Sequence, residues 1–461
     1  MSSRFLSLLP LCLAVSLVSG CMVGPDYQKP SAPMSAQFKE AAGWKAAAPR
    51  DDQPKGPWWE LYQDAPLNAL VAQVQISNQN VAFYQAQYLQ ALALVRQSRA
   101  DLLPVVSGSL DSTRSKAATS GSSSNSISNS NTATLSASWE LDLWGKLRRT
   151  VEQDRASAQA SQAQLASATL SAQSSLAQDY FQLRVLDQRI ELYRQTVQAY
   201  EGYLRVIQNK YDEKISSRAD LAQAKALLES ARASALDLQW QRAQYEHAIA
   251  LLIGKPPADF ALAADKNWGV KIPNIPTGLP SQLLERRPDI AVAERDMAAA
   301  NAAVGVATAA YYPDLTISAS GGWSDLFSVP ARFWSVGPSL AGTIFDFGAT
   351  KAGVDQARAA YDATVATYRQ SVLTGLGEVE DYLVELRTLE PEIQAQGRAA
   401  TAAKDSAEVT LNQYQEGVID YLDVATTQAT SLSQQQSLLS LTGTQLVTSV
   451  QLIAALGGGW E

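Results

Sequence analysis

The feature that most constrains the fold of this chain is an apolar seam that ends at Tyr211. Apolar residues recur at alternating spacings of three and four, which is the pattern of a coiled coil. No proline interrupts the chain between Pro104 and Pro256, so the pattern predicts one helix of about 65 residues from Lys146, roughly 100 Å long. A helix of that length has no globular core to lie on, so we expect its seam to meet other long helices. The seam consists of Leu183, Leu186, Ile190, Tyr193, Val197, Tyr200, Leu204, Ile207 and Tyr211.

A second seam follows and predicts the partner helix. It continues the same spacing, and only Arg242 breaks its apolar character. The two helices are expected to form an antiparallel hairpin that turns at residues 212–217. Packing explains single residues of such seams, so we expect function to reside in the shape of the hairpin. The second seam consists of Leu221, Ala224, Leu228, Ala231, Ala235, Leu238, Arg242, Tyr245, Ile249 and Leu252.

The composition suits close-packed helices that also have a polar, solvated face. Only 8% of the 461 residues are aromatic, and Ala, Gln and Ser dominate the middle of each half. The net charge is −8, and it becomes −9 (36 basic and 45 acidic residues) if a leader with Arg4 and no acid is removed. This acidic balance argues against nucleic acid as a partner.

The first residues predict a lipoprotein leader. Arg4 precedes an apolar run that is too short for a membrane-spanning helix. The sequence Val-Ser-Gly-Cys that ends at Cys21 resembles a bacterial lipobox, so residues 1–20 are interpreted as a signal peptide. Acylation of Cys21 by two or more chains would anchor the protein firmly, since each buried CH₂ contributes about 0.8 kcal/mol. An ordinary secretory leader with a coincidental Cys is the alternative.

The residues around the cleavage site add two expectations. Cys12 leaves with the leader, so the mature chain keeps one Cys and can form no internal disulfide. The residue after Cys21 is Met22 and not the Asp that resembles an inner-membrane retention signal. This favours location in the outer membrane. Residues 21–66 are rich in Pro and Ala and are interpreted as an extended, lipidated segment. Residues 67–103 then predict a helix that stops at Pro104.

A period-two pattern at residues 133–143 predicts a strand with one apolar and one wet face. Its length suits a tilted strand that crosses a bilayer, which needs about 9 to 11 residues. Val106, Gly108 and Leu110 indicate a preceding strand, and the Ser/Asn-rich residues 116–131 a solvated loop between the two. A surface hairpin of a soluble sandwich would show the same pattern.

The chain then repeats itself. The segment that ends at Pro104 matches the one that ends at Pro313 at an offset of 209, and Asp220 matches Asp423 at an offset of 203. Each half of the sequence is therefore predicted to form a helix, two strands, a long helix and a return helix. The first repeat covers 67–254, with strands at about 104–115 and 131–143 and a helical hairpin at about 146–253. A proline-rich linker, 255–280, precedes the second repeat, 281–461, with strands at about 313–323 and 335–347 and a hairpin at about 348–457.

Four strands per chain cannot close a sheet in lipid, where an open edge would leave backbone groups unpaired. Chains must therefore pool their strands. Two copies would give eight strands and a filled interior, whereas three would give twelve and room for a channel. The expected fold is thus mainly α-helical with a membrane β-barrel, and its polar faces line one bore. Within each repeat, Asp142 beside Gly145 and Asp346 beside Gly348 are expected to serve the strand-to-helix junctions.

At this point the residues resemble a known family, the TolC-like outer membrane factors, and within it the NodT-type lipoproteins of resistance-nodulation-division efflux systems. The resemblance covers nearly the whole mature chain in the expected order. It implies a homotrimer with a twelve-stranded barrel in the outer membrane, and a periplasmic helical tunnel that docks on an adaptor protein and an inner-membrane pump. The matching stretches are the lipobox with Gly24-Pro-Asp-Tyr27, Trp139-Glu-Leu-Asp-Leu-Trp-Gly145, Gly278-Leu-Pro-Ser281, Arg286-Arg-Pro-Asp-Ile290 and Leu456-Gly-Gly-Gly-Trp460.

The resemblance also implies a periplasmic gate at the hairpin tips. In the family an Asp matching Asp220 bonds to a Tyr matching Tyr414, and the position of Asp423 forms an acidic ring. This chain departs from the pattern at Thr426, where a second ring often carries Asp, and at Lys214, where a turn Gly is usual. The alternative to a gate is that these acidic residues are ordinary solvated side chains near a turn. The gate residues are expected to be Asp220, Tyr414, Leu422, Asp423 and Thr426.

Other classes of function find little support. His247 is the single histidine, and the chain has no Cys/His cluster, phosphate loop or nucleophile elbow, so we expect neither an enzyme nor a cofactor or metal. The mature chain has three Met, which disfavours a thioether relay for soft metals. A lipid-anchored coiled-coil protein that spaces the envelope without conducting is the alternative from another class.

Overall fold

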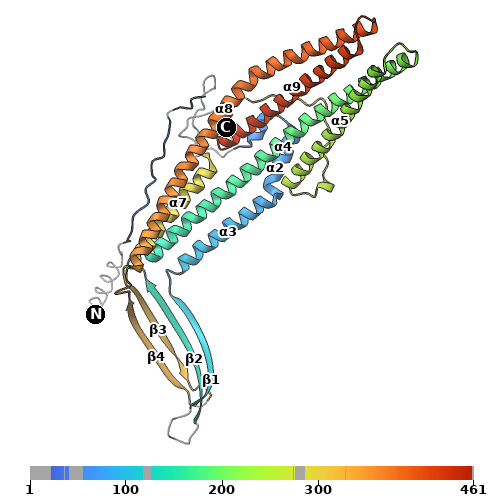
Figure 1. The fold of residues 1–461 in the computed structure, drawn as a ribbon. Coiled ribbons are helices and arrows are strands. Elements are labelled where there is room, and N and C mark those ends of the chain that lie inside the picture. Colours follow the sequence, from blue (N-terminus) through green and yellow to red (C-terminus); the bar gives the residue numbers. More distant parts are fainter. Residues whose placement is uncertain are drawn as a thin grey trace. The chain divides into compact units, whose positions relative to one another are not determined.

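The computed structural model describes residues 22–35, 37–40, 56–117, 126–273, 275, 286–327 and 329–458, so the expected signal peptide and Cys21 lie outside the described residues. This part of the chain is mainly helical and has one four-stranded sheet (Figure 1). The chain divides into two compact units, and each takes segments from both halves of the sequence. Unit 1 comprises Met1–Ala32, Ala86–Ala163 and Ala291–Gln370, and unit 2 comprises Pro33–Gln85, Gln164–Ile290 and Ser371–Glu461.

Four long helices correspond to the two predicted hairpins. Helix α4 spans Lys146–Asp212 and α8 spans Ala349–Gln415, with 67 residues each. The return helices α5 (Arg218–Leu252) and α9 (Tyr421–Ala455) have 35 residues each. The prediction of one uninterrupted helix from Lys146 is therefore confirmed.

The two seams of the first hairpin pack against each other within unit 2. Their buried residues form one cluster, which consists of Leu186, Tyr193, Tyr200, Leu228, Ala231 and Leu238. Removing apolar surface from water contributes about 25 cal/mol per Å², and helix propensity alone is too weak to hold long helices in one arrangement. The paired seams therefore stabilise the hairpin.

The predicted helix over residues 67–103 is wrong in one respect, because it is broken at Asn78. Helix α2 spans Ala65–Ser77 and α3 spans Gln79–Ala100. The Asn78 side chain accepts hydrogen bonds from the N–H groups of Asn80 and Val81, and it donates one to the carbonyl of Leu252 at 2.7 Å. Asn78 thus caps α3 and ties the break to the end of α5.

The N-terminal region is also less extended than predicted up to residue 66. A 3₁₀ turn, η1, spans Trp58–Tyr62, and Asp64 caps α2 by accepting a bond from the N–H of Leu67 at 3.0 Å. Pro66 lies in the first turn of α2, where its missing N–H costs nothing. Of the linker, η2 spans Pro257–Asp259, and α7 then spans Pro288–Ala309.

The sheet belongs to unit 1 and has the order β1-β2-β3-β4, with every neighbouring pair antiparallel. The strands are β1 (Val105–Ala117), β2 (Ser126–Leu141), β3 (Asp314–Ser324) and β4 (Ala331–Ala341). Strands β1 and β4 are the two edges of this sheet, and no strand of the described chain pairs with their outer sides.

Two predictions about the strand ends are wrong. The loop predicted at 116–131 is shorter, because β1 and β2 pair as far as Ala117 and Ser126; polar side chains support this end, and Ser112 bonds to Asn131 at 2.6 Å. The strand predicted at 335–347 lies instead at Ala331–Ala341. Phe345 therefore lies outside the sheet, in the segment between β4 and α8.

Candidate functional site: sheet faces, strand-to-helix junctions and hairpin tips

The sheet has two chemically different faces, which follow from strand alternation and the pairing register. On the apolar face, Leu135 lies between Gly108 and Gly321, and Trp139 is paired with Ile317. The face continues onto β4, where Trp334 is 79% exposed. The apolar face consists of Val106, Gly108, Leu110, Ala133, Leu135, Ala137, Trp139, Leu141, Leu315, Ile317, Ala319, Gly321, Trp323, Trp334, Val336, Pro338 and Leu340, with Arg332 near its end.

The opposite face carries hydroxyl groups across all four strands. Ser136 lies between Ser107 and Ser320, and the hydroxyls of Ser320 and Ser335 are 2.9 Å apart. We call this the hydroxyl face, and it also carries Ser109, Thr134, Ser138, Glu140, Thr316, Ser318 and Ser339, with the apolar Val105 and Phe333 near its ends. A sheet with one exposed apolar and one hydroxyl face can separate lipid from water.

Asp142 lies at the junction of β2 and α4. Its carboxylate accepts hydrogen bonds from the backbone N–H groups of Leu147 and Arg148, at 3.0 and 2.9 Å, so it satisfies two donors at the start of α4. Gly145 has a φ of +82°, and a Cβ there would lie 2.5 Å from Cγ of Met22. The junction therefore needs glycine both for its backbone conformation and for the close approach of the N-terminal segment.

Asp346 occupies the corresponding place before α8. Its carboxylate accepts bonds from the N–H of Gly348 at 2.9 Å and from the N–H of Thr350 at 2.7 Å. Gly348 has a φ of +93°, but a Cβ there would meet no atom within 4 Å. The two junctions thus share their backbone geometry and differ in crowding.

The hairpin turns are closed by left-handed residues and a capping box. Lys214 has a φ of +61°, and Gly417 in the second turn has a φ of +78°. Lys214 therefore adopts a conformation that favours glycine. The hydroxyl of Ser217 accepts a bond from the N–H of Asp220, and the carboxylate of Asp220 accepts one from the N–H of Ser217, both at 3.0 Å.

The structure brings Asp220 and Tyr414 close together but places Ser216 between them. The Ser216 hydroxyl donates to the Asp220 carboxylate at 2.9 Å. Burial and the negative charge of Asp220 raise the pKa of Tyr414, and its contact with Ser216 opposes that rise. Among the described residues, Asp220 bonds to Ser216 and Ser217 rather than to Tyr414, because its short side chain already caps its own helix. The direct bond expected from the resemblance stays a prediction, and in this chain Ser216 contacts both groups.

The tips of the two hairpins pack on each other within unit 2. Tyr414 lies 5.7 Å from the ring of Tyr421, and the Lys210 ammonium lies 4.3 Å from the ring centre of Tyr414. The buried residues of this contact are Ile207, Leu221, Ala224, Tyr421, Val424 and Ala425. Asp220 and Tyr414 therefore belong to the contact between the tips.

Three other expected gate residues do not join this contact. Leu422, Asp423 and Thr426 are exposed on one face of α9. Leu422 is 63% exposed, which is unusual for an apolar side chain beside a packed core. The structure therefore separates the expected gate into a packed pair and an exposed row.

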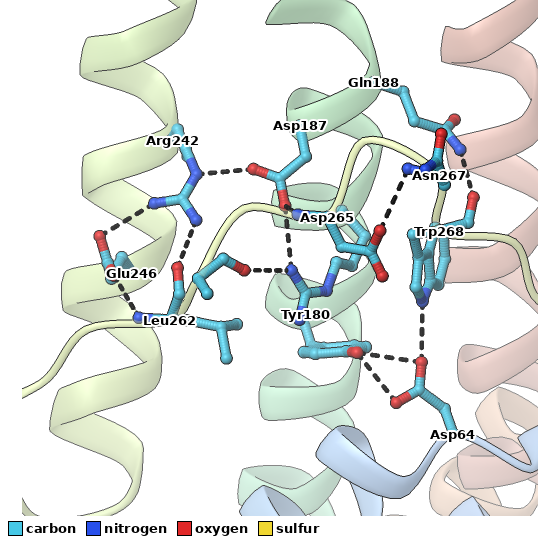
Figure 2. A network of polar contacts seen from close by, with 12 residues as sticks. Asp64, Tyr180, Asp187, Gln188, Arg242, Glu246, Leu262, Asp265, Asn267 and Trp268 are labelled. Atoms are coloured by element: carbon cyan, nitrogen blue, oxygen red, sulfur yellow. Dashed lines mark hydrogen bonds and ion pairs between the residues drawn. The ribbon is translucent and has the colours of Figure 1, made fainter. Parts of the chain in front are cut away.

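Sequence reasoning missed a network of polar residues that holds the linker to the first hairpin (Figure 2). Arg242, the exception in the second seam, donates to Asp187 of α4 at 2.7 Å and to the carbonyl of Leu262. Asp187 is buried and also pairs with Arg184 at 3.0 Å. The sequence signal that could have revealed this network was Arg242, a charged residue at an apolar seam position. Its partners could be identified only from the structure.

A second buried carboxylate, Asp64, extends this network. The indole N–H of Trp268 donates to Asp64 at 2.8 Å, and the hydroxyl of Tyr180 donates to it at 2.9 Å (Figure 2). Asp64 thus joins the start of α2, helix α4 and the linker. We call Leu262–Trp268 the strap.

Potential metal ligands do not cluster in the part of the chain that the structure describes. His247 is exposed on α5, and the described residues hold no group of three or more His, Cys, Asp or Glu side chains that could bind a metal ion.

Only α9, among the described helices, is long and apolar enough to cross a membrane, but 44% of its apolar window is buried in the protein. This burial fits a core helix.

Comparison with known proteins places this fold among envelope efflux channels. Residues 70–255 and 279–458 match the family described as outer membrane efflux protein. The probable efflux pump outer membrane protein TtgC of Pseudomonas putida is 31% identical and covers 98% of this chain and 96% of its own length. The cation efflux system protein CusC of Escherichia coli is 29% identical, with 98% and 99% covered. The solved outer-membrane channel OprN is 29% identical, with a TM-score of 0.87, and the match covers 95% of this chain and 100% of that one.

This chain belongs to the outer membrane efflux protein family. It is an outer membrane channel of an efflux system in a Gram-negative bacterium, and its family is one of transport proteins rather than enzymes.

Proposed function

We propose that three copies of this chain form the exit duct of a tripartite efflux pump. The observation that carries this proposal is the four-stranded sheet with one exposed apolar face, one hydroxyl face and two unpaired edges. In lipid each edge must find a partner strand, and β1 of one copy and β4 of the next are the available ones. Three copies give twelve strands, which leaves room for a bore lined by the hydroxyl face.

The internal repeat supports the same assembly. Helix α3 starts at Gln79 and α7 at Pro288, an offset of 209; α4 and α8 start at Lys146 and Ala349, an offset of 203. The paired helices have equal lengths of 22 and 67 residues. Two similar halves per chain, repeated three times, would give a tunnel of six similar sectors.

The long hairpins would form the periplasmic tunnel, and their tips its mouth. In a trimer, the exposed row of Leu422, Asp423 and Thr426 would be present three times, with an acidic ring at Asp423. Like charges in such a ring repel, so the contact between the tips at Ser216 and Tyr414 would oppose opening. The partners would be a periplasmic adaptor protein and an inner-membrane pump of the resistance-nodulation-division type.

The cargo would be set by the pump rather than by this duct. CusC is named for cation efflux and TtgC only as an efflux pump protein. In this chain Met297 is fully buried, so its thioether cannot line a bore. An unselective water-filled bore fits a polar face built from Ser and Thr.

Conductance through the purified trimer in planar bilayers tests the proposal. We expect stepwise channels whose appearance requires intact trimer, with heat-dissociated protein as the control. A folded, membrane-bound trimer that never conducts would support the alternative, a non-conducting envelope spacer.

The lipid anchor is a separate part of the proposal. Cys21→Ser should yield a folded protein that is no longer acylated, because the variant lacks the thiol that carries the first acyl chain. Metabolic labelling with palmitate measures this. Equal label in the variant and the parent chain would refute the anchor and leave the channel proposal untouched.

A further inference from the structure

The N-terminal segment lies in a groove along α7 in unit 1, where Arg149 of α4 donates to the carbonyls of Val23 and Gly24 and pairs with Asp26. The Asn301 side chain donates to the carbonyl of Pro25 at 3.0 Å. Gly24 lies so close to Gly305 that a Cβ on Gly24 would be 2.5 Å from its Cα. A Cβ at position 305 would lie 2.8 Å from the side chain of Arg149, so glycine there makes room for the arginine that binds the segment.

Tyr27 fills the same groove farther along. Burial, together with the nearby Glu294 of α7 and Tyr361 and Tyr368 of α8, raises the pKa of Tyr27 to about 12. Lys29 then pairs with Glu294 at 2.7 Å. The groove in the second repeat is thus occupied by the protein's own chain.

The corresponding groove in the first repeat, between α3 and α4, contains a cavity of about 700 Å³. Three of its positions, Leu92, Arg96 and Ala158, correspond through the repeat to positions that meet the N-terminal segment. Their counterparts are Asn301, Gly305 and Tyr361. The cavity therefore lies on the face of α3 that corresponds, through the repeat, to the face of α7 that the N-terminal segment covers.

The first-repeat groove differs in chemistry from its counterpart. Arg96 stands at the position that Gly305 occupies in the second repeat, so this groove has a cationic side chain where its counterpart has none. Arg99 and Arg155 line the cavity beside it, and all three arginines are exposed. Within the described chain no carboxylate forms an ion pair with any of them. Within the described residues of one chain, the groove thus offers three guanidinium groups without a carboxylate partner, which suit phosphate oxygens.

The position of the arginines relative to the membrane follows from the lipid anchor. Cys21 precedes Gly24 by three residues, which span at most about 11 Å. Gly24 contacts Gly305, which therefore lies within about that distance of the lipid surface. Arg96 is the counterpart of Gly305 in the first repeat, so we expect it at the same depth. Arg99 is about 4.5 Å nearer to the strands along α3.

We propose that Arg96, Arg99 and Arg155 bind the phosphate of an anionic phospholipid in the inner leaflet of the outer membrane. This inference rests on the proposed barrel and lipid anchor. Leu89 and Leu92 lie at the end of the cavity farther from the strands. Acyl chains therefore stay in the leaflet, and the arginines hold the headgroup alone. Basic residues at a membrane surface attract anionic lipid in this way.

Lipid retention tests the site in the full-length acylated protein. The protein is placed in nanodiscs with equal amounts of phosphatidylglycerol and phosphatidylethanolamine, extracted, and analysed for bound lipid by native mass spectrometry. We expect the parent to retain phosphatidylglycerol preferentially. Each Arg→Gln change at positions 96, 99 and 155 should lower that preference about fivefold. The matched control removes three exposed basic residues of unit 2, Arg205, Lys225 and Arg398, and should leave the preference unchanged.

The outcomes separate the lipid site from the channel. Equal retention by the parent and the R96Q/R99Q/R155Q variant would overturn the site, as would displacement of the lipid by excess inorganic phosphate. Trimer content and conductance are measured on the same samples. A conducting trimer without lipid preference refutes this site alone, whereas a parent that forms no conducting trimer refutes the proposed function.

Discussion

At the scale of single residues, the two strand-to-helix junctions show how one sequence pattern acquires two sets of contacts. Asp142 and Asp346 each satisfy N–H groups at the start of a long helix. Gly145 and Gly348 both have positive φ, but only Gly145 lies against Met22, next to the expected lipid anchor. The first junction therefore also positions the N-terminal segment.

Gly145→Ala and Gly348→Ala form a matched pair that tests this difference. Both variants force alanine into the left-handed region and should lose about 1 to 2 kcal/mol of stability. Only Gly145→Ala should also expose the N-terminal segment to protease, because the new Cβ displaces Met22. Thermal unfolding and limited proteolysis measure the two effects. Equal protection of the segment in both variants would contradict the role of Gly145.

At the scale of elements, the strap is held by buried charge rather than by apolar packing alone. Asp187 receives hydrogen bonds from Arg184, Arg242 and the N–H of Asp265. Glu246 accepts a bond from the N–H of Leu262 at 2.6 Å. Removing one member of a buried ion pair leaves the other charge without full compensation. The strap should therefore detach when Arg242 is lost.

Arg242→Leu should destabilise unit 2 by about 3 kcal/mol and open the strap to trypsin at the exposed Lys266. Arg232→Leu on the same helix is the control, because Arg232 forms only exposed ion pairs with Glu201 and Glu229. Such surface pairs contribute about 0 to 1 kcal/mol. Thermal unfolding and the rate of cleavage are the measurements, and similar values for the two variants would show that the strap does not depend on Arg242.

The tips of the hairpins supply the second prediction at this scale. Ser216→Ala and Tyr414→Phe should each weaken the contact between the tips by about 0.5 to 1.5 kcal/mol per chain, so the closed population falls and single-channel conductance rises. Tyr211→Phe is the control, since Tyr211 is exposed at the end of α4. If the double variant remains an intact trimer with unchanged conductance, the contact does not keep the mouth closed.

The same contact predicts how closure depends on pH. Burial alone would raise the pKa of Asp220, but its bonds to the N–H of Ser217 and to the hydroxyls of Ser217 and Ser216 lower it from 3.8. A carboxyl group with a lowered pKa contributes stability above its ordinary value, and that contribution is lost as pH falls through the lowered pKa. The Asp220 contribution to closure should therefore stay constant from neutral pH down to about pH 4, and its loss should raise conductance only in stronger acid. A rise between pH 7 and pH 5 would indicate a different titrating group.

At the scale of the whole molecule, the two faces of the sheet should meet different solvents. Single Cys residues at Ser136, Ser138 and Ser320 should react with a membrane-impermeant thiol reagent from the bore. Cys at Leu135, Trp139 or Val336 should remain unlabelled, because the apolar face would lie in lipid. The parent chain is the blank, since its mature Cys is expected to be acylated. Labelling of both sets would contradict the barrel.

The sequence by itself determined the features that follow from local periodicity. Spacings of three and four predicted the helices α4 and α5 and their paired seams, and period two predicted the faces of β2. Turn chemistry was also local, since Asp142 and Asp346 lie within a few residues of the N–H groups they bind. The side-chain period of a helix or strand is a property of its own backbone, so neighbouring residues suffice to reveal it.

Only the tertiary structure decided the features that depend on distant partners. Asn78 ends α2 because the carbonyl of Leu252, 174 residues away, receives its amide. Arg242 is tolerated in a seam because Asp187 and the strap compensate its charge. Burial and long-range pairing set the free energy of such polar groups, and neither can be read from spacing along the chain.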